Sequence, residues 1–139
     1  MRIVLDTNVL VSALLSPEGP PARVLDLVTS GQVLLLLGEP ILREYERVLR
    51  RRRFRIGGEA VTELLGGLDA LAEHIPALPS GPQLPDPDDT KFLDCARAGL
   101  ADCIVTGNLR HFPKRLCRDV TVLSPGKFIQ VWREEAEGT

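Results

Sequence analysis

The chain has 139 residues, of which 44% are hydrophobic and only 4% aromatic, so its core must be aliphatic. A chain of this length can bury such a core as one domain without disulfides or a structural metal. The formal net charge of -2 excludes a protein that grips nucleic acid by net positive charge alone, although it leaves room for a local basic patch.

The three cysteines are odd in number and show no Cys-x-x-Cys spacing, so neither a disulfide framework nor a zinc site is indicated. We expect Cys95, Cys103 and Cys117 to be buried free thiols in a reducing cytoplasm. The N-terminal apolar run is interrupted by Asp6 and Asn8, and no small-residue cleavage site follows, so no signal peptide is expected. No segment approaches transmembrane length, which predicts a cytoplasmic protein without a membrane anchor.

The first stretch, MRIVLDTNVLVSALL, predicts a strand, a polar turn and a helix. Residues 2–5 form a short apolar strand, while residues 9–15 are too long and unpunctuated to be a second strand. In the turn between them, Thr7 or Asn8 can cap the helix. Asp6 is then left at the carboxyl end of a parallel strand, which is the edge where open α/β sheets bind ligands.

The middle of the chain continues this alternation of helix and strand. ARVLDLVTSG predicts a short helix with a glycine stop, and QVLLLLG predicts a strand with both faces covered. The segment EPILREYERVLRRRRFR predicts a helix with Pro40 near its start. GGEAVTELLGGLDALAEH predicts a further helix or helix pair, broken near Gly66 and Gly67.

The last part begins with a proline-rich extended loop, IPALPSGPQLPDPDD, and then predicts a helix, two strands and a final helix. The helix is TKFLDCARAG, the strands lie in DCIVTGN and VTVL, and Ser124 caps the final helix. The alternation favours a three-layer α/β/α sandwich with a parallel central sheet. We expect one domain over residues 1–131 and a frayed tail over residues 132–139.

Three acidic residues open the helix that begins near Pro87. On a helical wheel, the apolar residues of its next turn fall within roughly 60° of Asp89, so this side chain points toward the core. Asp86 and Asp88 are explained by the positive helix N-terminus, which favours acids. The inward direction of Asp89 is not explained in this way and favours a functional role.

The helix after Pro40 carries Glu44 and Glu46 on opposite shoulders of its apolar face. Either glutamate can turn into a cleft, and each can equally be a solvated surface acid, so the wheel does not choose between them. Asn8 and Asn108 follow threonines near strand ends. Their amides can cap helices, and they can also hold a hard cation or its water.

Carboxylates that converge without a partner repel one another, and a divalent cation removes that penalty. Mg²⁺ or Mn²⁺ held by a few carboxylates is suited to activating water against a phosphodiester. Asp102 opens its strand and is therefore left out, because it lies at the opposite edge of the sheet. The sequence offers no Ser-His-Asp or Cys-His set, and His74 and His111 are its two histidines.

Four blocks in order, IVLDTNVLVSALL, EYERVL, DPDDTKFLDCA and ADCIVTGNLRHFP, resemble the PIN-domain family. The chain is similar to VapC-like toxins and to toxin-antitoxin nucleases of that group, over about residues 1–131. The resemblance implies a parallel sheet with an acidic pocket at its carboxyl edge and Mg²⁺- or Mn²⁺-dependent cleavage of RNA. It also implies an antitoxin partner and self-association as a homodimer or higher oligomer.

Carried over residue by residue, the resemblance implies catalytic and metal-binding roles for Asp6, Glu44 and Asp89. Glu44 rather than Glu46 matches the acid before the aromatic residue, and Asp88 is the runner-up for the third acid.

Two positions depart from the family pattern. Asn108 stands where an aspartate is common, and His111 stands near the place of another acid. Both departures reduce the negative charge, so one metal ion is the expectation, with Asn108 as an additional ligand. Thr7 and Thr106 correspond to the hydroxyl residues found beside such sites, and Asn8 is expected to orient water or metal.

The resulting hypothesis is an endoribonuclease in which an activated water attacks phosphorus in line. Five arginines of the run RVLRRRRFR are candidates for contacting single-stranded RNA: Arg50, Arg51, Arg52, Arg53 and Arg55. The alternative for this run is a solvated helix end whose arginines suit the helix dipole.

Two rival functions fit parts of the same pattern. A PIN-like module that binds RNA or a protein without cutting is favoured by Asn108 and His111. A phosphotransfer domain with Asp6 as nucleophile is disfavoured, because a haloacid-dehalogenase-like site needs an aspartate where Asn8 stands. A receiver-like domain needs an acidic pair before the end of the first strand, which the sequence lacks.

Overall fold

The computed structural model describes residues 1–138 and shows a five-stranded sheet in the order β3-β2-β1-β4-β5. All four neighbouring pairs are parallel. The strands are β1 (Arg2–Leu5), β2 (Leu34–Leu37), β3 (Glu73–His74), β4 (Cys103–Val105) and β5 (Val122–Leu123). Because every strand runs in the same direction, their carboxyl ends meet at one edge of the sheet.

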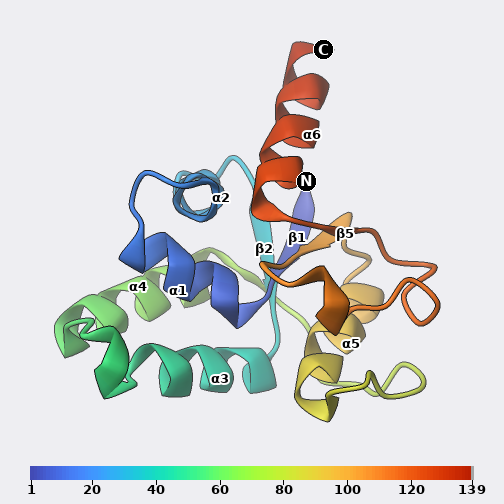
Figure 1. Ribbon diagram of the computed structural model, residues 1–139, viewed down its shortest axis with the longest axis horizontal. Helices are drawn as coiled ribbons and strands as arrows, with labels where there is room; N and C mark the ends of the chain where they lie inside the picture. Colours follow the sequence, from blue (N-terminus) through green and yellow to red (C-terminus); the bar gives the residue numbers. More distant parts are fainter. Residues whose placement is uncertain (139) are drawn as a thin grey trace.

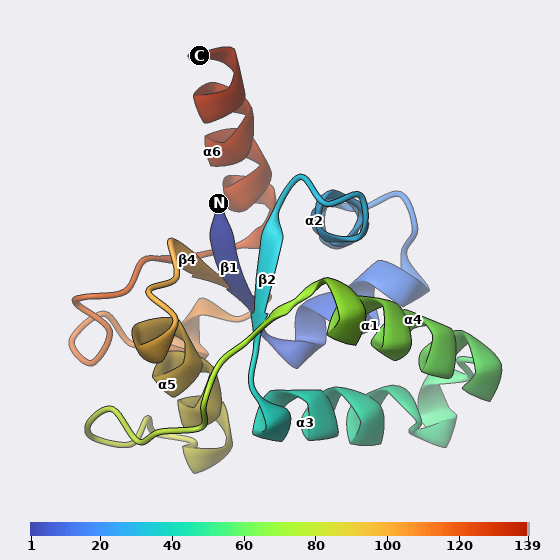
Figure 2. The ribbon, with the colours of Figure 1, turned by 180° about the vertical axis from the view of Figure 1, so that it is seen from behind.

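Helices cover both faces of this sheet, which confirms the predicted α/β/α sandwich (Figure 1). They are α1 (Thr7–Leu15), α2 (Pro20–Thr29), α3 (Glu39–Leu49), α4 (Gly58–Leu71), α5 (Thr90–Ala98) and α6 (Pro125–Glu137). Seen from either side, α1 to α4 gather on one side of the sheet and α5 lies on the other (Figure 2). Short 3₁₀ turns precede α5 and follow α3 and β4: η2 (Pro87–Asp89), η1 (Arg52–Phe54) and η3 (Leu109–His111).

The core is aliphatic, as the composition predicts. Ile3, Val4 and Leu5 of β1 are fully buried, and so are the last three leucines of β2, because helices cover both faces of these central strands. The three cysteines are buried free thiols with no disulfide between them, within residues 1–138. Within the same residues, none of the helices is long and apolar enough to cross a membrane.

Three local predictions are wrong. α4 runs without a break through Gly66 and Gly67, because both glycines lie on its exposed face and nothing forces the helix to end there. Residues 73–74 belong to β3 rather than to that helix, since they pair in parallel with the end of β2. The cap of α1 is Asp6, through its extended backbone, and not the side chain of Thr7 or Asn8.

Most of the expected frayed tail, residues 132–139, is helical, and residue 139 lies outside the described residues. α6 continues as helix to Glu137 and extends away from the sheet in Figure 1. Its start agrees with the sequence, since Ser124 Oγ accepts a hydrogen bond of 3.2 Å from the Lys127 N–H. The domain boundary at residue 131 stays a prediction.

Candidate active site

Asp6 lies at the carboxyl end of the central strand β1 and is only 4% exposed. Its backbone begins α1 with φ -65° and ψ 142°, but its carboxylate makes no capping bond to that helix. The carboxylate is instead held by neighbours. Thr106 Oγ1 donates a hydrogen bond of 2.8 Å to Oδ2, and Asn8 Nδ2 donates one of 3.3 Å to the same oxygen. The carboxylate is therefore fixed in place at the sheet edge.

Asp89 reaches the same edge from the other side of the sheet, at the end of η2 where α5 begins. The residue is 7% exposed, and its Oδ2 has no hydrogen-bond partner among residues 1–138. Asp86 does the capping instead, since its Oδ1 accepts a 2.9 Å hydrogen bond from the Asp88 N–H. Asp88 itself is exposed. Of these three acids, Asp89 is the one whose carboxylate is buried with an oxygen that has no hydrogen-bond partner among residues 1–138.

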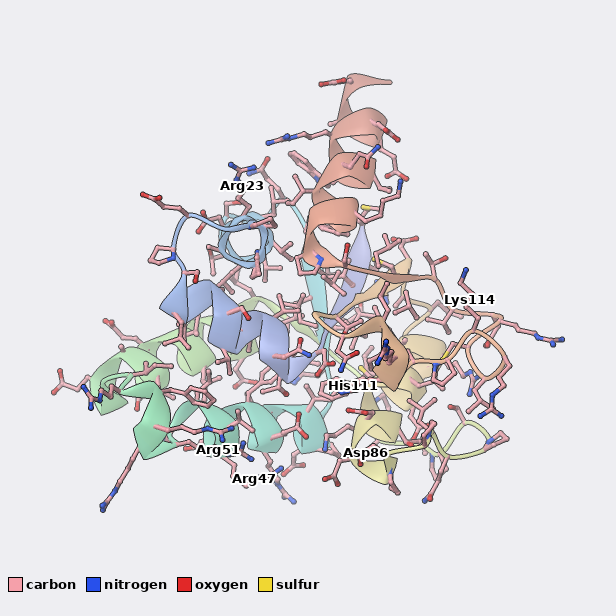
Figure 3. All side chains as sticks on the ribbon, in the orientation of Figure 1. Arg23, Arg47, Arg51, Asp86, His111 and Lys114 are labelled. Atoms are coloured by element: carbon pink, nitrogen blue, oxygen red, sulfur yellow. The ribbon has the colours of Figure 1, made fainter. Side chains whose placement is uncertain are left out.

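His111 faces both of these carboxylates. Its Nδ1 lies 3.6 Å from Asp6 Oδ2 and 3.7 Å from Asp89 Oδ2. One ligand atom from each of these residues falls within 4.8 Å of the other two. Figure 3 shows His111 beside the segment that contains Asp86, where η3 and the start of α5 approach each other. Two carboxylate oxygens and an imidazole nitrogen form a donor set that suits a divalent cation.

Asn108 orients this imidazole. Its Oδ1 accepts a 3.1 Å hydrogen bond from the Arg110 N–H, which turns its Nδ2 toward His111 Nε2 at 2.9 Å. The Asn108 side chain thus caps η3 with its oxygen and contacts His111 with its nitrogen. Asn8 bridges similarly, because its Oδ1 accepts a 2.9 Å hydrogen bond from the Gly107 N–H and so joins the start of α1 to the turn after β4.

Burial leaves the two aspartates short of compensating charge. Desolvation raises the pKa of Asp6, against the lowering effects of the Thr106 hydrogen bond and His111. Desolvation also raises the pKa of Asp89 to about 6, and the nearby carboxylates of Asp6, Asp86 and Glu44 raise it further while His111 lowers it. A site that resists ionisation in this way gains from a bound cation.

Glu44 enters the site from α3, while Glu46 does not. The side chain of Glu44 is 12% exposed; its Oε2 accepts a hydrogen bond from Thr7 Oγ1, and its Oε1 lies 2.7 Å from Lys91 Nζ. Glu46 is exposed and pairs with Arg50 at 3.3 Å. The structure thus separates two glutamates that the helical wheel leaves equivalent.

Tyr45 explains why α3 presents this face. Its buried hydroxyl donates a 2.6 Å hydrogen bond to the carbonyl of Leu5, the residue directly before Asp6. This bond ties α3 to the end of β1 beside Asp6. Glu44 directly precedes Tyr45 in the chain and is therefore held near the same strand end. The apolar face that the sequence shows for α3 is therefore anchored to the end of β1.

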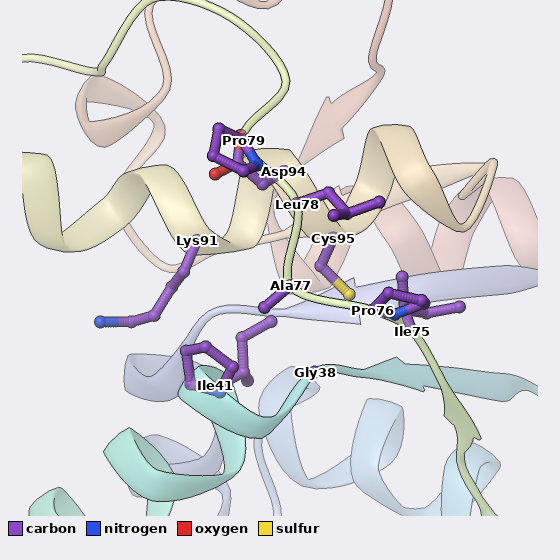
Figure 4. A pocket seen from close by; sticks show the side chains of 11 residues that line it. Gly38, Ile41, Ile75, Pro76, Ala77, Leu78, Pro79, Lys91, Asp94 and Cys95 are labelled. Atoms are coloured by element: carbon purple, nitrogen blue, oxygen red, sulfur yellow. The ribbon is translucent and has the colours of Figure 1, made fainter.

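Lys91 also belongs to this site, although no sequence pattern points to it. Its stem lines a small apolar pocket of about 130 Å³ between α3, α5 and the proline-rich segment, together with Ile41, Ile75 and Cys95 (Figure 4). Its ammonium reaches Glu44 across 47 positions of sequence. No local pattern links two residues so far apart, so only the packing of α3 against α5 reveals the pair.

The arginine run lies beyond the far end of α3, where the helix passes into η1. Arg50 is partly engaged, because it pairs with Glu46 and donates to Thr62 Oγ1 at 2.9 Å. The four arginines after it are exposed: Arg51, Arg52, Arg53 and Arg55. The guanidinium of Arg53 lies 4.8 Å from the ring centre of the half-buried Phe54. This end of the molecule is a cluster of solvent-facing cations on an acidic protein.

Fold and site together define a parallel α/β domain with buried carboxylates at the carboxyl edge of its sheet. Residues 2–110 match the model of the PIN domain family, so the chain belongs to that family. The resemblance drawn from the four sequence blocks is confirmed. Among curated proteins, the uncharacterized protein MJ1680 of Methanocaldococcus jannaschii is 29% identical over 111 residues, which are 78% of this chain and 71% of that protein.

Solved structures share the fold at low sequence identity. A chain of VapBC2 from Rickettsia felis, bound to a DNA fragment from its promoter, has a TM-score of 0.58 and 17% identity, covering 89% of this chain and 98% of its own. A chain of FitAB bound to an IR36 DNA fragment has a TM-score of 0.61 and 18% identity, covering 88% and 94%. A chain of FitAcB from Neisseria gonorrhoeae has a TM-score of 0.54 and 17% identity, covering 88% and 97%.

Proposed function

We propose that the protein is a divalent-metal-dependent endoribonuclease that hydrolyses RNA phosphodiester bonds. The observation that carries the proposal is the buried Asp89 Oδ2, which has no hydrogen-bond partner among residues 1–138 and faces Asp6 and His111. A buried carboxylate oxygen without a partner is costly, and a cation at this position removes the cost. Membership of the PIN domain family supports the nuclease chemistry.

In this proposal Asp6 and Asp89 hold the ion, either Mg²⁺ or Mn²⁺. Thr106 and Asn8 fix the orientation of the Asp6 carboxylate, and Asn108 fixes the His111 ring that faces it. A divalent ion supplies a Lewis acid that activates water and stabilises the leaving oxygen of a phosphodiester. Asn108 stays a candidate for a further ligand.

Other residues take supporting roles. Glu44 completes the acidic trio, and Thr7 holds its Oε2 in place. Asp88 lies one position from Asp89 and is exposed, and it stays the runner-up for the third acid.

Single-stranded RNA is the proposed substrate, with its phosphates contacted by the exposed arginines after α3. We also propose that the protein is the toxin of a cytoplasmic toxin-antitoxin pair that self-associates as a homodimer or higher oligomer. Support for the antitoxin partner comes from the fold relatives, which are known as VapBC2, FitAB and FitAcB complexes, two of them with bound DNA.

The test is cleavage of a mixed RNA pool by the full chain with Mg²⁺ or Mn²⁺ and with EDTA. We expect cleavage with either ion, none with EDTA, and a loss of at least about a hundredfold in Asp6→Asn, since the ion then loses a charged ligand. The matched control is Asp26→Asn, which changes an exposed aspartate on α2. Full metal-dependent cleavage by Asp6→Asn would refute the mechanism. Metal-dependent RNA binding without any cleavage would favour the non-cleaving module instead.

A further inference from the structure

Lys91 and Glu44 form an ion pair that is largely shielded from water. Lys91 Nζ lies 2.7 Å from Glu44 Oε1, and the two side chains are 19% and 12% exposed. The attraction between two charges is larger where water is excluded and screening by salt is weaker. Arg47 also faces Oε1, but at 3.8 Å and with a side chain 61% exposed, so its contribution is weaker.

The surroundings of Lys91 hold its ammonium in this position. Its alkyl stem runs from α5 along the wall of the apolar pocket (Figure 4), and its Nζ lies 5.8 Å from the ring centre of Phe92. A lysine can cover apolar surface with its stem while its ammonium stays in a polar environment. The ammonium is therefore largely shielded from water and lies against Glu44.

The acidic site consists of Glu44 on one side and of Asp6 and Asp89 on the other, and the two sides differ in what their carboxylate oxygens contact. Both oxygens of Glu44 are engaged, Oε2 by Thr7 and Oε1 by Lys91. Asp89 Oδ2 accepts no hydrogen bond from residues 1–138, and it faces Asp6 and the His111 ring, whose Nδ1 lies 3.7 Å away. Glu44 is thus paired with an ammonium, whereas the two aspartates face the His111 ring.

The formal charges agree with this division. Of the three acids Asp6, Glu44 and Asp89, Glu44 is the one that faces the Lys91 ammonium, so the two aspartates are the acids left to hold a divalent ion. A second divalent ion at Glu44 would have to displace the Lys91 ammonium. This would separate the ammonium from the Glu44 carboxylate and bring it close to a metal ion of the same sign, and both changes are unfavourable.

We propose that Lys91 is a positioning residue that acts as the resident cation of the acidic site: it occupies Glu44 and so limits the chain to one divalent ion. This inference rests on the proposed metal-dependent function. It assigns Glu44 to holding Lys91 rather than to holding the ion, and it assigns the ion to the side of Asp6 and Asp89.

The experiment is a Mn²⁺ titration of the full chain, with free Mn²⁺ followed by electron paramagnetic resonance. We expect one Mn²⁺ per chain for the unmodified protein and two for Lys91→Met, which keeps the stem against the pocket and removes the charge. Lys91→Arg keeps the charge and should bind one. Adding Glu44→Gln to Lys91→Met should return the count to one, because the carboxylate freed by the first change is gone. Lys127→Met, on an exposed lysine of α6, is the matched control and should bind one.

A count of two for the unmodified chain, or of one for Lys91→Met, overturns the inference. Circular dichroism verifies the fold of each variant, and Lys91→Gln replaces Lys91→Met if the latter does not fold. If the unmodified chain binds one Mn²⁺ but does not cleave RNA, the proposed function fails and the inference about Lys91 stands; if it binds no Mn²⁺, both are overturned. If the unmodified chain binds one ion and cleaves RNA while Lys91→Met still binds one, the inference about Lys91 alone is refuted.

Discussion

The buried carboxylate of Asp89 belongs to the candidate active site, and its burial also destabilises the folded protein when no metal ion is bound. The fold places it where burial raises its pKa to about 6, close to the carboxylates of Asp6 and Glu44. Its Oδ2 receives no hydrogen bond from residues 1–138. Buried polar atoms without partners are rare in folded proteins and concentrate at functional sites. Without a metal ion, the protein should therefore be less stable than it would be with the Asp89 carboxylate neutralised.

This cost predicts a pH dependence of stability in the metal-free protein. The folded chain binds the Asp89 proton more tightly than the unfolded chain, whose pKa is near 3.8, so ionisation opposes folding. The stabilising effect of the proton is complete below pH of about 4 and disappears as the pH rises through about 6. Asp89→Asn removes this pH dependence. The difference in free energy of unfolding, Asp89→Asn minus the unmodified chain, should therefore increase by about 1–3 kcal/mol as the pH rises from about 4 to about 7.

Urea unfolding in EDTA across this pH range measures the difference between the two chains. At pH near 7, added Mn²⁺ should then stabilise the unmodified chain by mass action and leave Asp89→Asn unchanged. A difference between the chains that does not vary with pH would show that the carboxyl of Asp89 has an ordinary pKa.

At the scale of the elements, two glycines illustrate how the same residue serves opposite purposes. Gly66 lies on the exposed side of α4, and a Cβ built there meets nothing within 4 Å. Gly99 ends α5 in a buried position, where a Cβ would lie 2.7 Å from Leu36 Cδ1 and 3.1 Å from the carbonyl oxygen of Cys95. Gly99 allows α5 to pack closely on β2, whereas Gly66 only weakens its helix.

Exchanging each glycine for alanine should therefore have opposite effects. Gly66→Ala should raise the free energy of unfolding by about 0.5–1 kcal/mol, because alanine loses less backbone entropy in a helix. Gly99→Ala should lower it by about 1–3 kcal/mol through overpacking. Urea unfolding at one pH compares both with the unmodified chain. Destabilisation by Gly66→Ala would mean that α4 is bent or broken at this point after all.

At the scale of the whole molecule, positive and negative charge are separated along α3. The acidic site receives Glu44 from the middle of this helix, and the exposed arginines follow the helix at its end. The formal net charge of -2 hides this separation. An RNA strand drawn to the arginines by its phosphates would approach the site without the protein being basic overall.

Salt dependence of RNA binding tests this role of the arginines. Measured in the Asp6→Asn chain to prevent cleavage, the affinity for single-stranded RNA should fall as salt rises. Replacing Arg51 and Arg53 with glutamine should make that slope shallower by about 0.7 for each phosphate that an arginine no longer neutralises. Arg23→Gln is the control, since Figure 3 shows Arg23 on α2, away from Arg51. An unchanged slope in the double variant would assign the run to a solvated helix end.

The sequence predicts the order of elements well because apolar periodicity and turn residues act over a few neighbouring positions. It places the strand before Asp6, the early Pro40 and the cap at Ser124 where the structure has them. It misses the continuity of α4 through its glycines. The reason is that glycine only lowers helix stability locally, and packing of Leu65 and Leu68 on the core outweighs that cost.

By itself, the sequence determined the strand-turn-helix unit that sets Asp6 at the sheet edge, and it determined the inward direction of Asp89, since both follow from local periodicity. Only the tertiary structure decided between Glu44 and Glu46, placed His111 against two carboxylates and paired Lys91 with Glu44. These are contacts between side chains far apart in the chain. Their distances are set by how α3, α5 and η3 pack around the ends of the strands, and no periodicity along the sequence contains that information.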